Sequence, residues 1–224
     1  MSALDSTLSV LFLILSYLIG SIPFGLIFGK AILNIDIRQY GSKNIGSTNA
    51  IRVLGKKIGY LVFLCDVLKG MIIIILLKLL NNIWQTPIDY IYYGAMAIIG
   101  HCFPIYLGFK GGKGVATSLG VVIALTPLPF AILMVVFAIV FYTTGYVSLA
   151  STFATISVLI TVWLLYAFGT TNSGFLNSFI AKPTLTLSII YSLISVLIIF
   201  KHFKNFKRLL NGTENSFKKK KTSD

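Results

Sequence analysis

Residues 8–28 form a continuous apolar segment without a charged side chain. A transmembrane helix needs about 20 predominantly apolar residues, so this run is long enough to cross a bilayer. It does not fit a secretory signal peptide, because no Lys or Arg precedes it. The whole chain is 56% hydrophobic and only 11% charged, whereas soluble domains are about one quarter charged. The sequence therefore predicts a membrane protein and excludes a disordered chain. Its two cysteines exclude a disulfide scaffold.

Six further apolar runs follow the first. They cover residues 58–77, 90–107, 115–126, 128–142, 149–168 and 184–200. Together the runs predict an all-α polytopic membrane protein with seven transmembrane helices, some of them short or broken. The fourth run is short, and Pro127 and Pro129 follow it. Short helices persist in lipid only where neighbours bury them or where they line a cavity, so the fourth helix is a candidate wall of a site.

The basic residues predict the orientation of the chain. It carries 19 Lys and Arg against six Asp and Glu, a net charge of +13. In a seven-span arrangement, all the basic residues except Lys69, Lys78 and Lys182 fall on one side. The positive-inside rule then places the N-terminus outside and the C-terminus in the cytoplasm. In so apolar a chain, the excess charge indicates the cytoplasmic side rather than binding of nucleic acid. Residues 1–210 are expected to form one integral membrane domain, and residues 211–224 a polar, basic and disordered tail.

The loop at residues 30–57 has a composition that suits a phosphate group. Gly41, Gly46 and Gly55 permit backbone conformations that other residues avoid. Backbone N–H groups left accessible by glycine, together with the planar fork of an arginine such as Arg52, are typical of anion sites. Hydroxyl and amide side chains accompany them, namely Ser42, Asn44, Ser47, Thr48 and Asn49. The alternative is a flexible polar loop with helix caps.

A second candidate segment covers residues 100–114. Three glycines surround Lys113, so the backbone can approach an anion while the ammonium group neutralises it. The glycines are Gly111, Gly112 and Gly114. A Walker motif does not fit, because Leu107 occupies the first glycine position and a glycine follows the lysine. His101 is either a general base or a structural hydrogen-bonding residue at a helix end, and the absence of a nearby acid in the sequence favours the structural role.

Three weaker patterns complete the set. Ser148 and Ser151 are three residues apart and would share a helix face, although serines in membrane helices more often serve packing. A helix that continues past residue 200 would place His202, Asn205 and Arg208 on one face. Asp66 and Lys69 lie inside the second apolar run, where we expect an internal ion pair.

Together these motifs resemble the bacterial acyl-phosphate:glycerol-3-phosphate acyltransferases, the PlsY family. The resemblance covers nearly the whole chain and is carried by residues 41–49 with Arg52, by residues 100–114, and by residues 202–214. It implies transfer of an acyl group from acyl phosphate to the 1-hydroxyl of glycerol 3-phosphate, giving lysophosphatidate and phosphate, the first step of bacterial phospholipid synthesis. It also implies a site that faces the cytoplasm from the bacterial cytoplasmic membrane. The soluble enzyme that produces acyl phosphate becomes a candidate partner, and no cofactor, metal ion or nucleic acid is expected.

The resemblance also implies roles for single residues. The catalytic set would be Ser42, Arg52, Lys113, His202 and Asn205. The substrate-binding set would be Asn44, Thr48, Asn49, His101, Gly111, Gly112, Gly114, Ser148, Ser151 and Arg208. Asp66 and Glu214 look structural, and the general base is either His202 or the phosphate of the substrate. The sequence departs from the family pattern at Lys43, Ile45, Ser47 and Phe203, the last replacing a usual Arg.

A transporter of an organic phosphate is the competing function. Broken helices and a polar pocket would serve such a protein too, but alternating access requires a site near the middle of the membrane. The phosphate-suited motifs instead fall on one predicted side, which favours the enzyme.

The topology can be tested with a cysteine introduced at Lys56. Because the charge asymmetry places the 30–57 loop in the cytoplasm, an impermeant thiol reagent should label this cysteine in inverted vesicles but not in intact cells. Labelling in intact cells would reverse the orientation, and with it the argument that the motifs share the cytoplasmic side.

Overall fold

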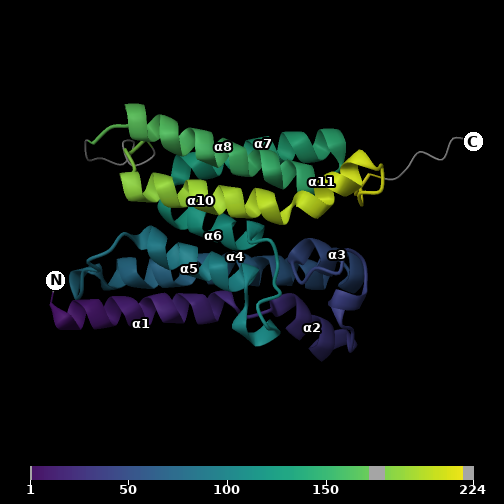
Figure 1. Cartoon of the computed structure of the whole chain (residues 1–224), viewed down its shortest axis with the longest axis horizontal. Coiled ribbons are helices and arrows are strands. Elements are labelled where there is room, and N and C mark those ends of the chain that lie inside the picture. Colours follow the sequence, from purple (N-terminus) through teal and green to yellow (C-terminus); the bar gives the residue numbers. More distant parts are fainter. Residues whose placement is uncertain (1, 172–179, 219–224) are drawn as a thin grey trace, which may run out of the picture. The chain divides into compact units, whose positions relative to one another are not determined.

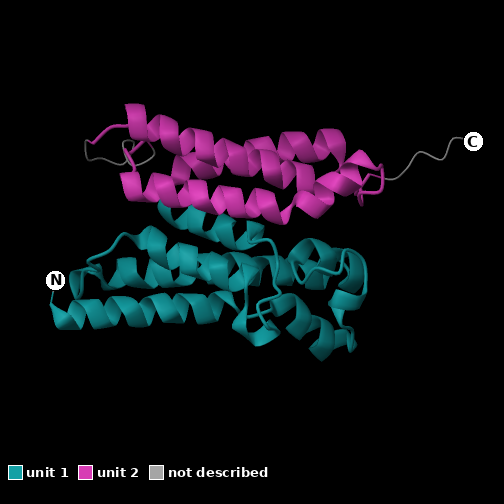
Figure 2. Ribbon diagram, in the orientation of Figure 1, with its two compact units in different colours: residues 1–125 teal, residues 126–224 magenta. Residues whose placement is uncertain are grey.

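The computed structural model describes residues 2–171 and 180–218, where the regular secondary structure is helical apart from one isolated bridge between Thr170 and Ala181 (Figure 1). The chain divides into two compact units, residues 1–125 and 126–224 (Figure 2). The units are described separately below.

Unit 1 contains six α-helices. They are α1 (Ala3–Gly20), α2 (Phe24–Leu33), α3 (Ser47–Leu54), α4 (Lys56–Leu79), α5 (Tyr90–Cys102) and α6 (Val115–Leu125). Short 3-10 turns occur at Ile37–Gln39, Leu80–Asn82 and Ile105–Leu107. Helix α1 packs on α5, while α3 and α6 both pack on α4. Helix α4 is therefore the central support of this unit.

The predicted first span is broken in the structure. Helix α1 ends at Gly20, and α2 begins at Phe24 after Pro23. Proline has no N–H group to donate and disfavours a helical conformation in the residue before it, so one continuous helix over residues 8–28 was the wrong expectation. The break leaves the carbonyl of Ile22 outside a helix, and the Lys69 ammonium donates a 3.0 Å hydrogen bond to it.

Glycines allow the helices of unit 1 to approach closely. A Cβ atom at Gly70 would overlap the carbonyl oxygen of Thr117, and one at Gly120 would overlap that of Val67. Helices α4 and α6 therefore meet backbone to backbone, as small residues permit in membrane proteins. Gly100 is packed in the same way against the carbonyl of Tyr17, which joins α5 to α1.

Unit 2 contains α7 (Pro127–Thr144), α8 (Val147–Phe168), α10 (Leu185–Lys201) and α11 (Phe203–Leu210). Pro127 occupies the start of α7, where a missing N–H costs little. Gly145 has a φ of 78° and ends this helix, so α8 can turn back and pack on α7. Helix α10 packs on α8. The chain then bends by 45° between α10 and α11.

The start of the predicted C-terminal tail is folded. Residues 211–218 return to the junction of α7 and α8, where the Phe217 N–H donates a 2.9 Å hydrogen bond to the Gly145 carbonyl. The Phe217 ring packs edge-on against Phe141, with ring centroids 6.0 Å apart, and Lys218 donates to the carbonyl of Thr143. The expectation of disorder was therefore wrong for residues 211–218, because they have partners on unit 2. Residues 219–224 lie outside the described residues.

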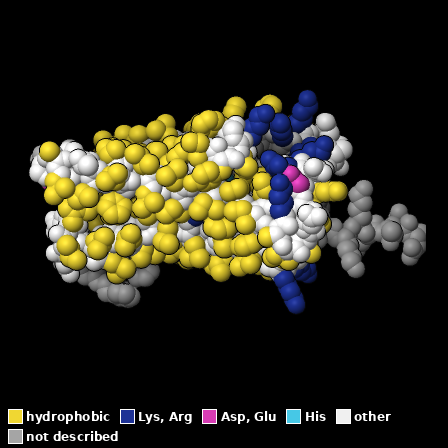
Figure 3. Space-filling view, turned by 90° about the horizontal axis from the view of Figure 1, so that it is seen from below, with side chains coloured by type: hydrophobic (Ala, Val, Ile, Leu, Met, Phe, Trp, Pro, Cys, Tyr) yellow, Lys and Arg dark blue, Asp and Glu magenta, His cyan; other side chains and the backbone are white. Residues whose placement is uncertain are grey.

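Five helical segments of the described chain are long and apolar enough to cross a membrane. They are Ala3–Gly20, Lys56–Asn82, Tyr90–Leu107, Pro127–Thr144 and Val147–Phe168. The bent pair α10 and α11 makes a sixth, while α2 and α6 are shorter apolar helices. Hydrophobic side chains cover most of the face seen in Figure 3, and Lys and Arg side chains gather at one end of it. The prediction of a helical chain with several membrane spans is confirmed, whereas the seventh span depends on the 11-residue α6 and stays a prediction.

Candidate functional site

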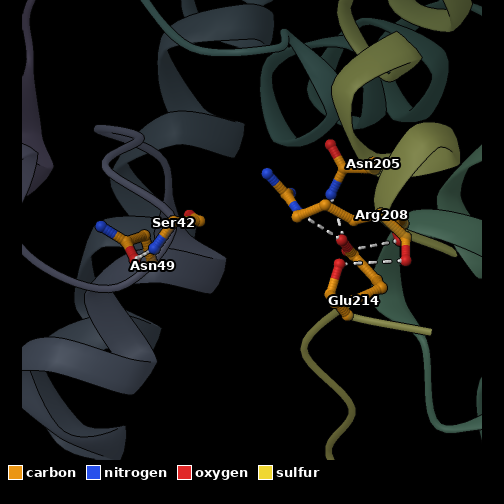
Figure 4. Close-up of polar contacts among 7 residues, drawn as sticks. Ser42, Asn49, Asn205, Arg208 and Glu214 are labelled. Atoms are coloured by element: carbon orange, nitrogen blue, oxygen red, sulfur yellow. Dashed lines mark hydrogen bonds and ion pairs between the residues drawn. The ribbon is translucent and has the colours of Figure 1, made fainter. Parts of the chain in front are cut away.

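Asn49 organises the loop before α3. Its side-chain oxygen accepts a 2.8 Å hydrogen bond from the Ser42 N–H (Figure 4). Its amide nitrogen donates to three backbone carbonyls, those of Ile37, Tyr40 and Asn44, at 2.9–3.2 Å. The side chain is buried, so it shapes the loop from inside rather than capping a helix. Gly41 and Lys43, both at φ 59°, complete the tight turn.

Some polar side chains of this loop brace its backbone, whereas others remain partly accessible. Asn44 accepts a 2.8 Å hydrogen bond from the Gly46 N–H and braces the loop. The Ser42, Thr48 and Arg52 residues are half-buried and remain partly accessible. Arg38 pairs with Asp36 at 2.6 Å, and hydrogen bonding from this guanidinium lowers the pKa of the Asp36 carboxyl to about 2.

The glycine loop leads directly into α6. The Gly112 N–H donates a 3.0 Å hydrogen bond to the carbonyl of His101, which ties the loop to the end of α5. Gly114 has a φ of 85°, and α6 begins at the next residue. The first N–H groups of a helix lack partners within it and favour a negative charge. Lys113 directly precedes Gly114 and is half-buried, so the segment stays a candidate for binding an anion.

His101 lies beneath the glycine loop. It is 4% exposed, and its Nδ1 atom is 3.6 Å from the Asp66 carboxylate. On the other side of the ring, a Cβ at Gly112 would overlap Nε2. Asp66 also forms the predicted ion pair with Lys69, at 2.8 Å. The nearby acid that the sequence did not reveal is therefore Asp66, which comes from the neighbouring helix α4.

Glu214 forms hydrogen bonds with three predicted site residues of unit 2. Its carboxylate accepts hydrogen bonds from Ser148 at 2.9 Å, from Asn205 at 2.7 Å and from Arg208 at 2.7 Å (Figure 4). The donors come from α8 and α11, and the acceptor from the returning C-terminal segment. Asn205 and Arg208 lie three residues apart within α11 and therefore share a helix face. Sequence reasoning had given Glu214 a structural role but did not identify it as their shared acceptor.

The surroundings of Glu214 shift its pKa. Burial raises the pKa of this carboxyl, but hydrogen bonds from Asn205, Arg208 and Ser148 act against burial and lower it below the ordinary value of 4.5. The charge of Arg208 contributes in the same direction. Glu214 is therefore ionised at neutral pH and compensates the positive charge of Arg208.

His202 faces Ser151 across the same unit. Its Nδ1 atom is 2.8 Å from the carbonyl of Ile198, which can only accept, so Nδ1 carries a proton. Its Nε2 atom is 3.1 Å from the Ser151 hydroxyl. Sequence reasoning missed this pair because the two residues are 51 positions apart. With this contact in place, a base role for His202 would act through the Ser151 hydroxyl.

Comparison with known proteins now identifies the family. The family model described as "Glycerol-3-phosphate acyltransferase" matches residues 10–212. The chain belongs to the glycerol-3-phosphate acyltransferase family. A relative of that name from Desulfotalea psychrophila is 44% identical over 94% of this chain and 98% of its own length. Another from Acholeplasma laidlawii is also 44% identical, over 95% of this chain and 94% of its own.

Solved structures agree with this assignment. The glycerol 3-phosphate form of PlsY, an integral membrane glycerol 3-phosphate acyltransferase, matches with a TM-score of 0.79 and 37% identity. The match covers 93% of this chain and 95% of that one. A lysophosphatidic acid form of PlsY has a TM-score of 0.76 and 36% identity. The chain is thus a membrane-embedded acyltransferase of the PlsY family, and a role in phospholipid synthesis follows from the family.

We predict that Glu214→Gln destabilises the acyltransferase at neutral pH. The amide keeps the size but loses the charge that three donors share, which should cost about 1–3 kcal/mol of unfolding free energy. Because the folded pKa is lowered, the stabilisation by Glu214 is complete above pH 4.5 and is lost as the pH falls below it. The two proteins should therefore differ in thermal unfolding in detergent at pH 7, and the difference should shrink in a second measurement below pH 4.5.

Asp89→Asn provides the control for this measurement. Asp89 caps α5 through the Ile91 N–H, and asparagine caps helices equally well. The control should change the unfolding temperature little at either pH. A Glu214→Gln protein as stable as the original at pH 7 would refute the role of this carboxylate.

Proposed function

We propose that the chain transfers an acyl group from acyl phosphate to the 1-hydroxyl of glycerol 3-phosphate, releasing phosphate and forming lysophosphatidate. The observation that carries the proposal is the loop around Lys113 at the start of α6, in a chain 37% identical to a PlsY described in its glycerol 3-phosphate form. We further propose seven spans in the bacterial cytoplasmic membrane, with the N-terminus outside and the site facing the cytoplasm. The soluble enzyme that supplies acyl phosphate remains a candidate partner.

The proposed chemistry needs two phosphate-binding regions. Both substrates carry a phosphate, and the chain has two segments suited to one, the loop before α3 and the loop before α6. In the first, Ser42 and Arg52 would bind, while Asn49 and Asn44 hold the backbone in place and Thr48 adds a hydroxyl. In the second, Lys113 and the N–H groups of Gly111 and Gly114 would bind, while Gly112, whose N–H donates to the His101 carbonyl, would shape the loop around them.

Acyl phosphate is an activated mixed anhydride, so its leaving phosphate needs little protonation. Negative charge grows on the carbonyl oxygen and on the departing phosphate, and cations and N–H groups held in place beforehand stabilise it. Holding both substrates in one site supplies much of the remaining rate enhancement. The acyl chain can stay in lipid while the head group reaches the polar residues.

For unit 2, we propose that His202 and Asn205 are catalytic and that Ser148, Ser151 and Arg208 bind substrate. Asn205, Ser148 and Arg208 present polar groups whose positions Glu214 sets. The proton of the attacking hydroxyl passes either to a phosphate oxygen of the substrate or to His202 through Ser151. The contact between the Ser151 hydroxyl and Nε2 of His202 supports the second route, and the pH profile of the Ser151→Ala reaction would separate the two.

The deciding experiment incubates the purified protein with acyl phosphate and glycerol 3-phosphate and measures phosphate and lysophosphatidate. Product formed in detergent, without two compartments, supports catalysis and excludes transport as the primary role. Substrate binding without product would refute the proposed reaction.

We predict that Lys113→Ala lowers this activity about 100- to 1,000-fold, the usual cost of removing one preorganised donor from a transition state. The matched control is Lys110→Ala, because Lys110 belongs to the same loop but is exposed. The control should keep most of the activity, and both variants should unfold at the temperature of the original protein. Near-normal turnover of folded Lys113→Ala would remove Lys113 from the site.

We also predict a reaction without a metal ion and without a covalent acyl-enzyme. The donor is already activated, so an acyl-enzyme offers little, and direct attack by the glycerol hydroxyl is the simpler route. Excess EDTA should leave the rate unchanged. Mass spectrometry after incubation with acyl phosphate alone should show unmodified protein. A kinetically competent acyl adduct, with Ser151 the first position to inspect because it contacts His202, would overturn this mechanism.

A further inference from the structure

We propose that the buried cluster of Asp66, Lys69 and His101 positions the loop that carries Lys113, and so controls catalysis without touching a substrate. The inference rests on the proposed function and assigns a positioning role to two residues, Asp66 and Lys69, that sequence reasoning treated as an ion pair holding the bundle. All the residues concerned belong to unit 1.

The cluster is costly to bury. The side chains of Asp66 and Lys69 are only 3% and 2% exposed, and His101 is 4% exposed. The first two lie within α4, an apolar helix that is a candidate membrane span. Replacing a buried ion pair by apolar residues is often neutral or stabilising. Stability alone is therefore a poor explanation for charges at this depth, where ionisable residues usually serve function.

His101 connects the cluster to the glycine loop by two contacts. Its backbone carbonyl accepts the Gly112 N–H at 3.0 Å. Its ring lies so close to Gly112 that a Cβ there would overlap Nε2, while one at Gly111 would overlap the His101 carbonyl. The two glycines therefore lie directly on the histidine. Asp66 contacts the opposite side of the His101 ring and so fixes the orientation of that ring. The ring in turn supports Gly112, the residue before Lys113.

Lys69 connects the same cluster to the other phosphate-suited loop. Its ammonium donates to the Ile22 carbonyl at 3.0 Å and lies 5.7 Å from the centroid of the Phe24 ring. Phe24 packs against a buried core of Ile37, Ala50, Leu54 and Val62. The next residue, Gly25, is packed against the carbonyl of Ile45 within the loop. One buried cluster thus supports both loops of unit 1.

The test replaces both charges together, with Asp66→Leu and Lys69→Met in one protein, so that neither charge is left uncompensated. A positioning role predicts a protein that unfolds near the original temperature but has about 10- to 100-fold lower kcat, the usual effect of losing an outer-shell partner. A folded paired variant with unchanged kcat would overturn the proposal.

A double-mutant cycle then tests whether the cluster acts through Lys113. His101→Asn should lower kcat on its own but change it less than about threefold in the Lys113→Ala background, because coupled residues are not additive. Independent, multiplying losses would overturn the proposal. The matched control is Lys78→Gln, a second lysine of α4, which donates to the Ala124 carbonyl at 2.6 Å. Its effect on kcat should be the same in both backgrounds.

The cycle separates this inference from the proposed function. Normal activity of Lys113→Ala alone would refute the placement of the site and leave no loop for the cluster to position. Loss of activity in Lys113→Ala with additive His101→Asn would preserve the site and refute the positioning role. Failure of both the paired variant and His101→Asn to insert as folded protein would assign the cluster to folding and also refute it.

Discussion

Polar groups exposed at breaks in apolar helices must find partners inside the protein, because lipid offers none. At the break between α1 and α2, the Ile22 carbonyl accepts a hydrogen bond from the Lys69 ammonium of α4. At the end of α5, the His101 carbonyl accepts a hydrogen bond from the Gly112 N–H of the glycine loop. These two hydrogen bonds also connect the segments that form the candidate site of unit 1. The same contacts therefore satisfy the backbone polar groups at the helix breaks and position the loops of the site.

Asn49 and Glu214 each form several hydrogen bonds and thereby organise the polar segments around them. Asn49 is neutral and bonds only to backbone groups, which shapes a loop without adding charge. Glu214 is charged and accepts hydrogen bonds from three side chains, those of Ser148, Asn205 and Arg208. A site that stabilises developing negative charge benefits from such arrangements, because its donors need not reorganise during the reaction. The negative charge of Glu214 also limits how strongly Arg208 can bind a phosphate.

Close packing explains several glycines that no loop conformation requires. Gly70 and Gly120 let α4 and α6 touch, and this contact brings the start of α6 to the helix that carries Asp66. Gly112 is needed for the same steric reason, since the His101 ring occupies the space of a Cβ. The glycine-rich motif around Lys113 is therefore explained in part by tight packing of the loop on His101.

The sequence by itself determined the helical membrane class, the positions of most helices and the motifs by which the family is recognised. These properties are local, since apolar length, charge and glycine spacing act over neighbouring residues. Only the tertiary structure decided that Asp66 contacts His101, that Ser151 faces His202 and that Glu214 gathers donors from two helices. Such contacts join residues far apart in the sequence through the packing of helices. In addition, helical periodicity in the sequence does not predict where a side chain points after a bend, as at His202. The return of residues 211–218 escaped prediction for the same reason, because its partners lie some 70 residues earlier in the chain.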